Sequence, residues 1–337
     1  MKRIWFMEAY ASQRGLILGI KDFAAEHKWD IEIVVSHRVP RYELLEVADI
    51  SLIEPKNLEE RLAFIIEKIG EYQIDLIHIV KDSEWFEAHR EEIEAAGAHL
   101  VTGSTDVKWL HCAEEKDLYT EYMNSLNLPV VPAVTIPTWD LLQETLDNPP
   151  FPKPLCIKPV RGMYGYGFWR FQEGISSAEL LFNPEKREIS PSLYLELMKR
   201  DTRAFIPQLL MPYFPGAERS VDIIAKDGQV VAAIGRVKQE GGKQLLEKGG
   251  EAIDLAIASA KAMHADGIVN VQTKDDASGK PYLLEINMRP STGFAYTSFS
   301  GVNLAGLFVA LHLGLMSAAE IAENVQTQFQ PQAIDVV

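Results

Sequence analysis

The sequence predicts a mixed fold, with an open parallel α/β domain followed by α+β lobes. Two observations predict this class. In residues 1–105, short β-branched or aromatic runs alternate with amphipathic stretches, which is typical of strands and helices in a parallel sheet. After residue 205, strand-like runs follow one another and are joined by turn signals such as Asp227-Gly228, which is typical of antiparallel hairpins. We therefore expect domains at 1–105, 106–205 and 206–337.

The first domain is expected to contain five strands and three helices. The strands are predicted at 3–7, 31–35, 49–53, 75–80 and 99–103, and the helices at 15–27, 57–72 and 83–97. The turn after the first strand, EAYASQRG, lacks the G-x-G-x-x-G pattern of dinucleotide-binding domains, which argues against a dehydrogenase. Ser12, Gln13 and Arg14 in this turn are weak candidates for anion binding, and a polar turn with a helix N-cap is the simpler interpretation.

The remaining elements follow from the same patterns. A long helix is predicted at 106–128, then strands at 155–160 and 168–171. Later strands are predicted at 204–210, 220–226, 229–238, 267–274 and 282–290, with a helix at 251–264. The apolar stretch 302–316 contains Asn303 and His312 and falls short of the roughly 20 residues of a membrane span, so we expect a buried helix.

Composition restricts the class of partner. The 337 residues carry a formal net charge of -15, which argues against nucleic-acid binding because phosphates would be repelled. The two cysteines, Cys112 and Cys156, offer neither a disulfide framework nor a zinc-site spacing, so a reducing cytoplasm is expected. The N-terminal apolar run breaks at Glu8 and is predicted to be a strand rather than a signal peptide. No membrane partner is expected.

A lysine and a glycine-rich loop occur together in the segment CIKPVRGMYGYGFWRF. A buried strand delivers Lys158, and Gly162, Gly165 and Gly167 follow before the next strand. Glycines allow the backbone to approach an anion, and a lysine supplies a charge for phosphate oxygens. The segment therefore favours a phosphate-binding loop. A plain β-hairpin, with glycines serving only the turn, is the structural alternative.

A second polar pattern lies in the segment YLLEINMRPSTG. Glu285, Asn287 and Arg289 occupy every second position of a predicted strand, so they share one face. Carboxylate and amide oxygens suit Mg²⁺, and a guanidinium suits phosphate oxygens. A half-exposed strand with a solvated polar face would explain the pattern equally well if it stood alone.

The order of these features resembles the ATP-grasp superfamily, and most closely its carbamoyl-phosphate-synthetase-like, carboxylate–amine ligase branch. The resemblance runs from about residue 106 to 314, and residues 1–105 resemble the domain that precedes the ATP-grasp lobes. The features that carry it are Lys116 in a helix, Ile-Lys158-Pro before the glycine loop, PQLL, GAERSVD, Gln272 and LLEINMRP. It implies a small lobe at 106–205 with the glycine loop and a large lobe at 206–337 with the metal site.

The resemblance also implies roles for individual residues. ATP would contact Lys116, Lys158, Gly162, Gly165, Gly167, Gln208, the backbone of Leu209 and Leu210, and Glu218 through its ribose. Mg²⁺ or Mn²⁺ would bind Gln272, Glu285 and Asn287. Arg289 would face the γ-phosphate, so that the catalytic set is Lys158, Glu285, Asn287 and Arg289. The sequence departs from the family where Leu209 replaces an acidic hinge residue and where Tyr164 and Tyr166 replace small loop residues.

The implied activity is an ADP-forming carboxylate–amine ligase that proceeds through an acyl-phosphate. Its partners would be a small carboxylate and an amine, and the resemblance is compatible with a homodimer. Arg161, Arg236, Lys238 and residues 291–293 are weaker candidates for anion contacts, and Asp222 is a candidate for supporting the site. Two alternatives stay open: a kinase-like phosphotransferase, and an ATP-binding regulatory subunit without turnover.

Overall fold

The computed structural model describes residues 1–9, 13–163, 165–200 and 205–336. These residues form two compact units. Unit 1 contains Met1–Ala113, Ala217–Thr273 and Ile286–Val337, and unit 2 contains Glu114–Gly216 and Lys274–Glu285. The first and third of the predicted domains thus contribute to the same unit, and the division into three domains stays a prediction.

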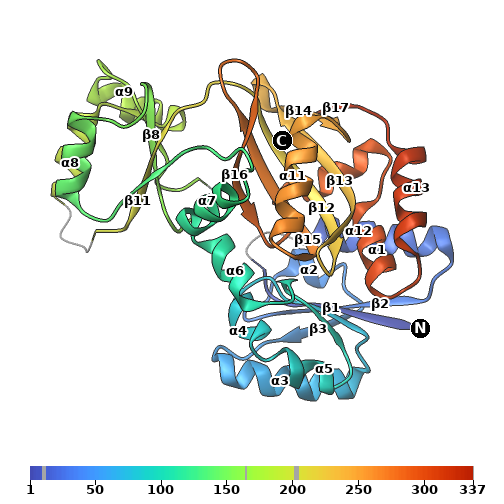
Figure 1. Cartoon of the computed structure of the whole chain (residues 1–337). Helices are drawn as coiled ribbons and strands as arrows, with labels where there is room; N and C mark the ends of the chain where they lie inside the picture. Colours follow the sequence, from blue (N-terminus) through green and yellow to red (C-terminus); the bar gives the residue numbers. More distant parts are fainter. Residues whose placement is uncertain (10–12, 164, 201–204, 337) are drawn as a thin grey trace. The chain divides into compact units, whose positions relative to one another are not determined.

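Unit 1 begins with a five-stranded parallel sheet in the order β3-β2-β1-β4-β5 (Figure 1). Its strands are β1 (Lys2–Phe6), β2 (Ile31–His37), β3 (Ile50–Ile53), β4 (Leu76–His78) and β5 (His99–Val101). Its helices are α1 (Arg14–His27), α2 (Tyr42–Leu45), α3 (Leu58–Tyr72), α4 (Ser83–Glu87) and α5 (Arg90–Ala95). The predicted open parallel α/β arrangement is confirmed.

Both faces of this sheet are covered because its strands carry apolar residues at successive positions. Ile4 and Phe6 of β1 belong to a core that includes α1 and the later helix α12 (Leu304–His312). Trp5 and Met7 point to the opposite face and pack with residues of α3 and α5, which Figure 1 shows together along one side of the sheet. Because successive side chains of β1 point to opposite faces and both sets are apolar, helices pack on both faces of the sheet.

The C-terminal part of the chain builds a second sheet in the order β16-β15-β12-β13-β14-β17, with β6 paired to β15. Its strands are β6 (Gly103–Ser104), β12 (Glu218–Lys226), β13 (Gln229–Lys238), β14 (Lys243–Glu247), β15 (Ala265–Asp275), β16 (Pro281–Asn287) and β17 (Ala333–Asp335). The associated helices are α11 (Glu251–Ala262), α12, α13 (Ala318–Gln328) and a 3-10 helix at Phe294–Ser300. Asp227 and Gly228 join β12 to β13 with φ of 50° and 75°, as the predicted hairpin turn requires.

Unit 2 is built around a five-stranded sheet in the order β10-β9-β8-β11-β7. Its strands are β7 (Val134–Ile136), β8 (Leu155–Pro159), β9 (Trp169–Phe171), β10 (Glu188–Ile189) and β11 (Gln208–Pro212). Its helices are α7 (Lys116–Ser125), α8 (Trp139–Asp147), α9 (Ser177–Phe182) and α10 (Pro191–Lys199), with a 3-10 turn at Pro184–Lys186. Strands β8 and β9 pair antiparallel, so the glycine-rich loop joins neighbouring strands.

Two predicted helices are each divided in the structure. The predicted helix 106–128 is α6 (Val107–Glu114) followed by α7, because Glu115 has extended backbone angles (φ -95°, ψ 96°). The predicted helix 83–97 is α4 followed by α5, with a non-helical residue at His89. Both predictions were wrong in treating a continuous apolar pattern as one helix.

No single helix among the described residues is both long and apolar enough to cross a membrane. The pair Phe294–Ser300 and Leu304–His312, bent by 104°, meets these criteria only when its two members are taken together.

Candidate active site

Strand β8 places Lys158 beside an acidic side chain of unit 2. Leu155, Cys156 and Ile157 are buried in the sheet, and Lys158 follows them with its side chain 13% exposed. The Lys158 Nζ lies 3.3 Å from Glu285 Oε2, although 127 positions separate the two residues. The predicted association of the early lysine with the late carboxylate is therefore realised within this unit.

Lys116 approaches the same carboxylate from the first turn of α7. Its Nζ donates to the carbonyl oxygen of Gly162 at 2.8 Å and lies 3.9 Å from Glu285 Oε2. Its side chain is 10% exposed. The break at Glu115 makes Lys116 the first residue of a helix instead of a residue in mid-helix. Two ammonium groups thus approach one carboxylate in a partly buried site.

The glycine-rich loop is held next to these lysines. Gly162 accepts the Lys116 hydrogen bond, and the guanidinium of Arg187 contacts the carbonyl of Gly165. Gly165 and Gly167 have φ of 64° and 76°, and a Cβ on Gly167 would lie 2.7 Å from Pro159 Cγ. Glycine is therefore required at 167 both by conformation and by space.

Of the two tyrosines in this loop, one belongs to the residues that the structure describes. The side chain of Tyr166 is 69% exposed, whereas Tyr164 lies outside the described residues.

The predicted metal ligands are distributed over both units. Gln272 lies in β15 of unit 1, Glu285 in unit 2, and Asn287 at the end of β16 in unit 1. Within unit 1, Arg289 Nη2 donates to Asn287 Oδ1 at 3.2 Å, so the guanidinium stays beside the amide on the predicted polar face. The assignment of Gln272, Glu285 and Asn287 to one magnesium ion stays a prediction.

The predicted adenine contact needs a correction. Leu209 pairs with Lys158 in β8 and Thr135 in β7, and Leu210 pairs with Ile157 and Val134. A strand with partners on both edges uses its backbone N–H and C=O groups in the two ladders. The backbone of Leu209 and Leu210 is therefore engaged in the sheet and is not free to pair with an adenine edge.

Strand β11 has fewer partners towards its end. Strand β7 ends opposite Leu210, while Met211 and Pro212 continue to pair only with β8. Gln208 is buried, and its Nε2 donates to the carbonyl of Ile206 at 2.7 Å, so its side chain supports the start of the strand.

Several of the candidate residues are engaged in ion pairs. Glu218, predicted to bind ribose, is the first residue of β12 and is ion-paired with Lys238, the last residue of β13. Arg161 is ion-paired with Glu115. Arg14 donates to the carbonyl of Glu43 and lies 3.3 Å from Glu46 Oε2. These contacts satisfy the charges in the structure, and the roles predicted for these residues in ligand binding stay predictions.

Arg236 is a structural residue in a buried network. Its Nε donates to Asp222 Oδ2 at 2.9 Å, and its Nη2 donates to Ser291 Oγ at 2.7 Å. Ser291 Oγ in turn donates to Asp222 Oδ1 at 2.7 Å, and Asn270 donates to the same oxygen at 2.9 Å. The network fixes the segment that follows Arg289, which is the supporting role proposed for Asp222.

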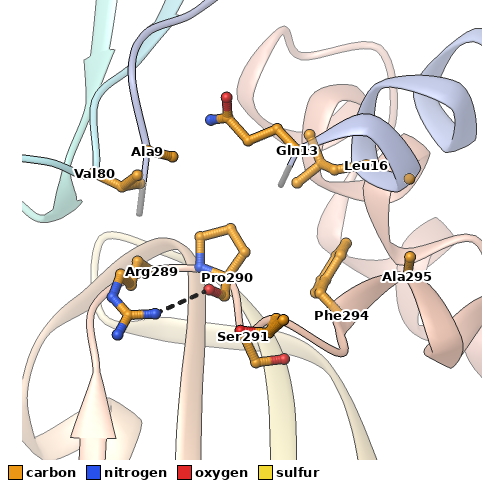
Figure 2. A pocket seen from close by; sticks show the side chains of 11 residues that line it. Ala9, Gln13, Leu16, Val80, Arg289, Pro290, Ser291, Phe294 and Ala295 are labelled. Atoms are coloured by element: carbon orange, nitrogen blue, oxygen red, sulfur yellow. Dashed lines mark hydrogen bonds between the residues drawn. The ribbon is translucent and has the colours of Figure 1, made fainter. Parts of the chain in front are cut away.

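A cavity in unit 1 lies beside Arg289. Its enclosed volume is small, about 30 Å³, and it opens to solvent. It is lined by Ala9, Gln13, Gly15, Leu16, Val80, Arg289, Pro290, Ser291, Thr292, Phe294 and Ala295. Figure 2 shows Gln13 and Leu16, at the start of α1, across from the turn that contains Pro290 and Ser291, with the Gln13 amide pointing away from that turn.

Gln13 is the unusual member of this cavity. Its side chain is 5% exposed, and neither amide atom has a hydrogen-bond partner among the described residues. A buried amide without partners is costly, by roughly 1–3 kcal/mol, unless a ligand or solvent supplies them. The sequence indicated Gln13 only as a weak candidate; Ser12 lies outside the described residues. The apolar lining residues Val80 and Phe294 carried no sequence signal for this role.

Cys156 precedes Lys158 on β8 and faces away from solvent. It is 4% exposed, and its Sγ lies 3.8 Å from the carbonyl oxygen of Pro212. Burial raises the pKa of the Cys156 thiol to about 12. The thiol is therefore neutral at physiological pH and does not act as a nucleophile.

Part of the chain matches a family model. Residues 204–336 match the family model described as "ATP-grasp in the biosynthetic pathway with Ter operon". No curated protein matches the sequence significantly. Solved structures align with nearly all of the chain. The L-amino acid ligase from Bacillus licheniformis has a TM-score of 0.62 at 14% identity, covering 95% of this chain and 76% of that chain.

Two further structures carry nucleotides according to their descriptions. N5-carboxyaminoimidazole synthetase from Staphylococcus aureus, complexed with ADP, has a TM-score of 0.64 at 13% identity, covering 93% and 77% of the two chains. The biotin carboxylase domain of 2-oxoglutarate carboxylase from Hydrogenobacter thermophilus, in complex with MgADP, ADP and bicarbonate, has a TM-score of 0.60 at 17% identity, covering 93% and 70%.

The chain has an ATP-grasp fold. The predicted resemblance and the predicted mixed α/β and α+β fold class are both confirmed. In the ATP-grasp segment 204–336 lie Gln272, Glu285, Asn287 and Arg289, whereas Lys116 and Lys158 precede it. The approach of both lysines to Glu285 therefore connects residues outside the matched segment to a residue inside it.

Proposed function

We propose that this protein is an ATP-dependent, ADP-forming ligase that joins a small carboxylate to an amine through an acyl-phosphate. The observation that carries the proposal is the approach of Lys116 and Lys158, at 3.9 and 3.3 Å, to one carboxylate oxygen of Glu285. Partly buried positive charge favours a polyanion such as a triphosphate. The ATP-grasp fold supports the same class of substrate.

The residues of unit 2 would bind and orient the phosphates of ATP. Lys116 and Lys158 offset the charge of the phosphate oxygens, and backbone N–H groups of the glycine loop add hydrogen bonds. Phosphoryl transfer requires little covalent chemistry from the protein, so positioning and charge neutralisation account for most of the expected rate enhancement.

The predicted metal-binding residues suit a hard divalent cation. Glu285 offers a carboxylate, and Gln272 and Asn287 offer amide oxygens, which are ligands that Mg²⁺ and Mn²⁺ prefer. When bound, the cation neutralises phosphate charge and aligns the γ-phosphoryl group. Arg289 lies beside Asn287 through the 3.2 Å hydrogen bond and would offset the charge of the transferred phosphoryl group.

The reaction then has two balanced steps. A substrate carboxylate oxygen forms a bond to the γ-phosphorus, the bond from that phosphorus to the bridging oxygen breaks, and ADP leaves with the electron pair. The amine nitrogen next forms a bond to the acyl carbon, the carbon–oxygen bond to phosphate breaks, and the amine loses a proton to water. The products are an amide, ADP and phosphate.

The cavity beside Arg289 is the proposed site for the carboxylate substrate. It combines the guanidinium of Arg289 with the buried amide of Gln13, which can both donate and accept hydrogen bonds. Apolar residues such as Val80 and Phe294 form other parts of its lining. A small acid with a second polar group near the reacting carboxylate fits this chemistry.

An assay of phosphate release tests the proposed function. The protein is incubated with MgATP and a panel of small carboxylates, with and without a panel of amines. A ligase releases phosphate only when both substrates are present, and Glu285→Gln should lower this rate by about 100-fold or more, because charge positioning is lost. Gln13→Leu should raise the KM for the acid and leave the KM for ATP unchanged.

The exposed Glu91→Gln variant is the matched control and should behave like the wild type. Phosphorylation of one substrate alone, without need for an amine, would identify a phosphotransferase instead. If Glu285→Gln leaves ATP consumption unchanged in every mixture that supports turnover, the assignment of this residue is wrong.

A further inference from the structure

Two histidines and an aspartate meet in unit 1, in a part of the chain that the proposed ligase reaction does not use. His99 begins β5, Asp266 lies near the start of β15, and His312 ends α12. Nitrogen atoms of the two rings and a carboxylate oxygen of Asp266 all lie within 4.8 Å of one another. Asp266 and His312 are 1% and 6% exposed, and His99 is partly exposed.

The outer nitrogen of each ring faces an oxygen acceptor. His99 Nδ1 lies 3.3 Å from Glu94 Oε1, and His312 Nε2 lies 3.2 Å from the carbonyl oxygen of Ala225. Since the Ala225 carbonyl only accepts hydrogen bonds, His312 Nε2 carries the proton, and His312 Nδ1 is unprotonated in the neutral ring. The proton of a neutral His99 lies either on Nδ1, towards Glu94, or on Nε2, towards His312.

His99 Nε2 and His312 Nδ1 face each other at 3.3 Å. The ring centres are 5.5 Å apart and the ring planes differ by 21°, so the rings meet edge to edge through these nitrogens. A proton on His99 Nε2 makes this contact a hydrogen bond to His312 Nδ1, and a metal ion bound by both nitrogens would satisfy it as well.

Asp266 adds a third acceptor to the cluster. Its Oδ1 accepts a hydrogen bond from the backbone N–H of Asp227 at 3.0 Å. Its Oδ2 is buried and has no hydrogen-bond partner among the described residues. The cluster therefore gathers two ring nitrogens and a buried carboxylate oxygen that has no hydrogen-bond partner among the described residues.

A metal ion satisfies all three atoms together, whereas a hydrogen bond between the two rings leaves Asp266 Oδ2 without a partner among the described residues. Nitrogens bound to a tetrahedral zinc at about 2.0–2.1 Å lie roughly 3.3–3.4 Å apart, which agrees with the observed separation. The hydrogen bond of His312 to Ala225 and the close approach of His99 to Glu94 are outer contacts of the type that orients histidine ligands in metal sites.

We propose that His99, Asp266 and His312 bind a divalent transition-metal ion, with Zn²⁺ the best match to two imidazoles and one carboxylate. This site differs from the proposed magnesium site, whose ligands are all oxygen atoms. Bound metal would connect β5, β15 and α12 and so stabilise unit 1. The proposal does not depend on the ligase activity.

Metal titration of the full-length, chelator-treated protein tests the proposal. Isothermal calorimetry with Zn²⁺ should show one equivalent bound, and Co²⁺ in its place should give the strong visible absorption of a site of low coordination number. Zinc should raise the thermal unfolding temperature of the wild type. His99→Ala should weaken Zn²⁺ binding by at least 100-fold and abolish the stabilisation, while Glu94→Gln should weaken binding by about 10-fold through the outer hydrogen bond.

The control is His111→Ala, which removes a partly exposed histidine that pairs with Glu84 outside the cluster. This variant should bind zinc like the wild type. Equal zinc affinity in the wild type and His99→Ala would overturn the proposal, as would the absence of any stoichiometric binding to the wild type. His99 carries the test because it is the most exposed of the three ligands, and its replacement perturbs the core least.

Discussion

Glu8 illustrates how a single buried charge is stabilised at the end of the first strand. Its side chain is 7% exposed and accepts hydrogen bonds from Arg38 at 3.0 Å and Lys81 at 2.6 Å. Burial by itself raises the pKa of Glu8, but the hydrogen bonds from Arg38 and Lys81 outweigh it and lower the pKa from 4.5 to about 2. The charged carboxylate therefore contributes to stability.

The sign of its pH dependence follows from this depressed pKa. The contribution of Glu8 is present above about pH 4.5 and is lost as the pH falls toward 2. We expect the difference in unfolding free energy between wild type and Glu8→Gln to shrink by about 3 kcal/mol between pH 7 and pH 2. Urea unfolding at several pH values measures this difference.

The exposed Glu91→Gln variant serves as the control, and its difference from wild type should be small and nearly constant over the same range. A Glu8→Gln difference that does not change between pH 7 and pH 3 would contradict the ion-pair account.

The sequence predicted single site residues only where a local pattern carried the signal. Lys158 before the glycines, and Glu285, Asn287 and Arg289 at alternate positions, could be recognised without a structure. The contribution of Gln13 to the cavity could not be established from sequence, because its environment depends on residues 290–295, far along the chain.

At the scale of elements, the glycine-rich loop depends on contact with the strand before it. Gly167 and Gly174 both have positive φ, 76° and 78°, but only Gly167 lies against Pro159. Alanine at 174 should therefore cost about 1 kcal/mol of unfolding free energy, from backbone strain alone. Alanine at 167 should cost about 1–3 kcal/mol more, because its Cβ would clash with the proline.

Urea unfolding of the two variants checks this comparison. Equal losses for Gly167→Ala and Gly174→Ala would show that the loop is not packed against β8 as described.

The order of the elements could be predicted from local sequence patterns, whereas some of their boundaries could not. The strands of the parallel sheet were predictable because β-branched runs alternate with amphipathic ones, and the structure confirms this order. The break between α6 and α7 was not, since the pattern of apolar residues continues through Glu115. The extended backbone there accompanies an ion pair with Arg161, a long-range contact that no local pattern reveals.

At the scale of the whole molecule, the order of motifs predicted the ATP-grasp fold through resemblance to that superfamily, and the comparison with solved structures agrees. Contacts between residues far apart in the sequence could not be predicted from the motifs. His99 and His312 are 213 positions apart, and nothing in either local sequence indicates that their rings meet. Likewise, the pairing of Leu209 and Leu210 on both edges depends on where β7 enters the sheet.

The rate at which a reagent modifies the buried Cys156 thiol can be used to measure motion around β8, the strand that also carries Lys158. Alkylating reagents reach this sulfur only when the side chains packed over it move away, because it is protonated and lies in a buried cluster with Leu209 and Met211. The rate of its modification therefore reports how often this cluster opens. Nucleotides that tighten the sheet should slow the labelling, and the half-buried Cys112 provides an internal reference in the same sample.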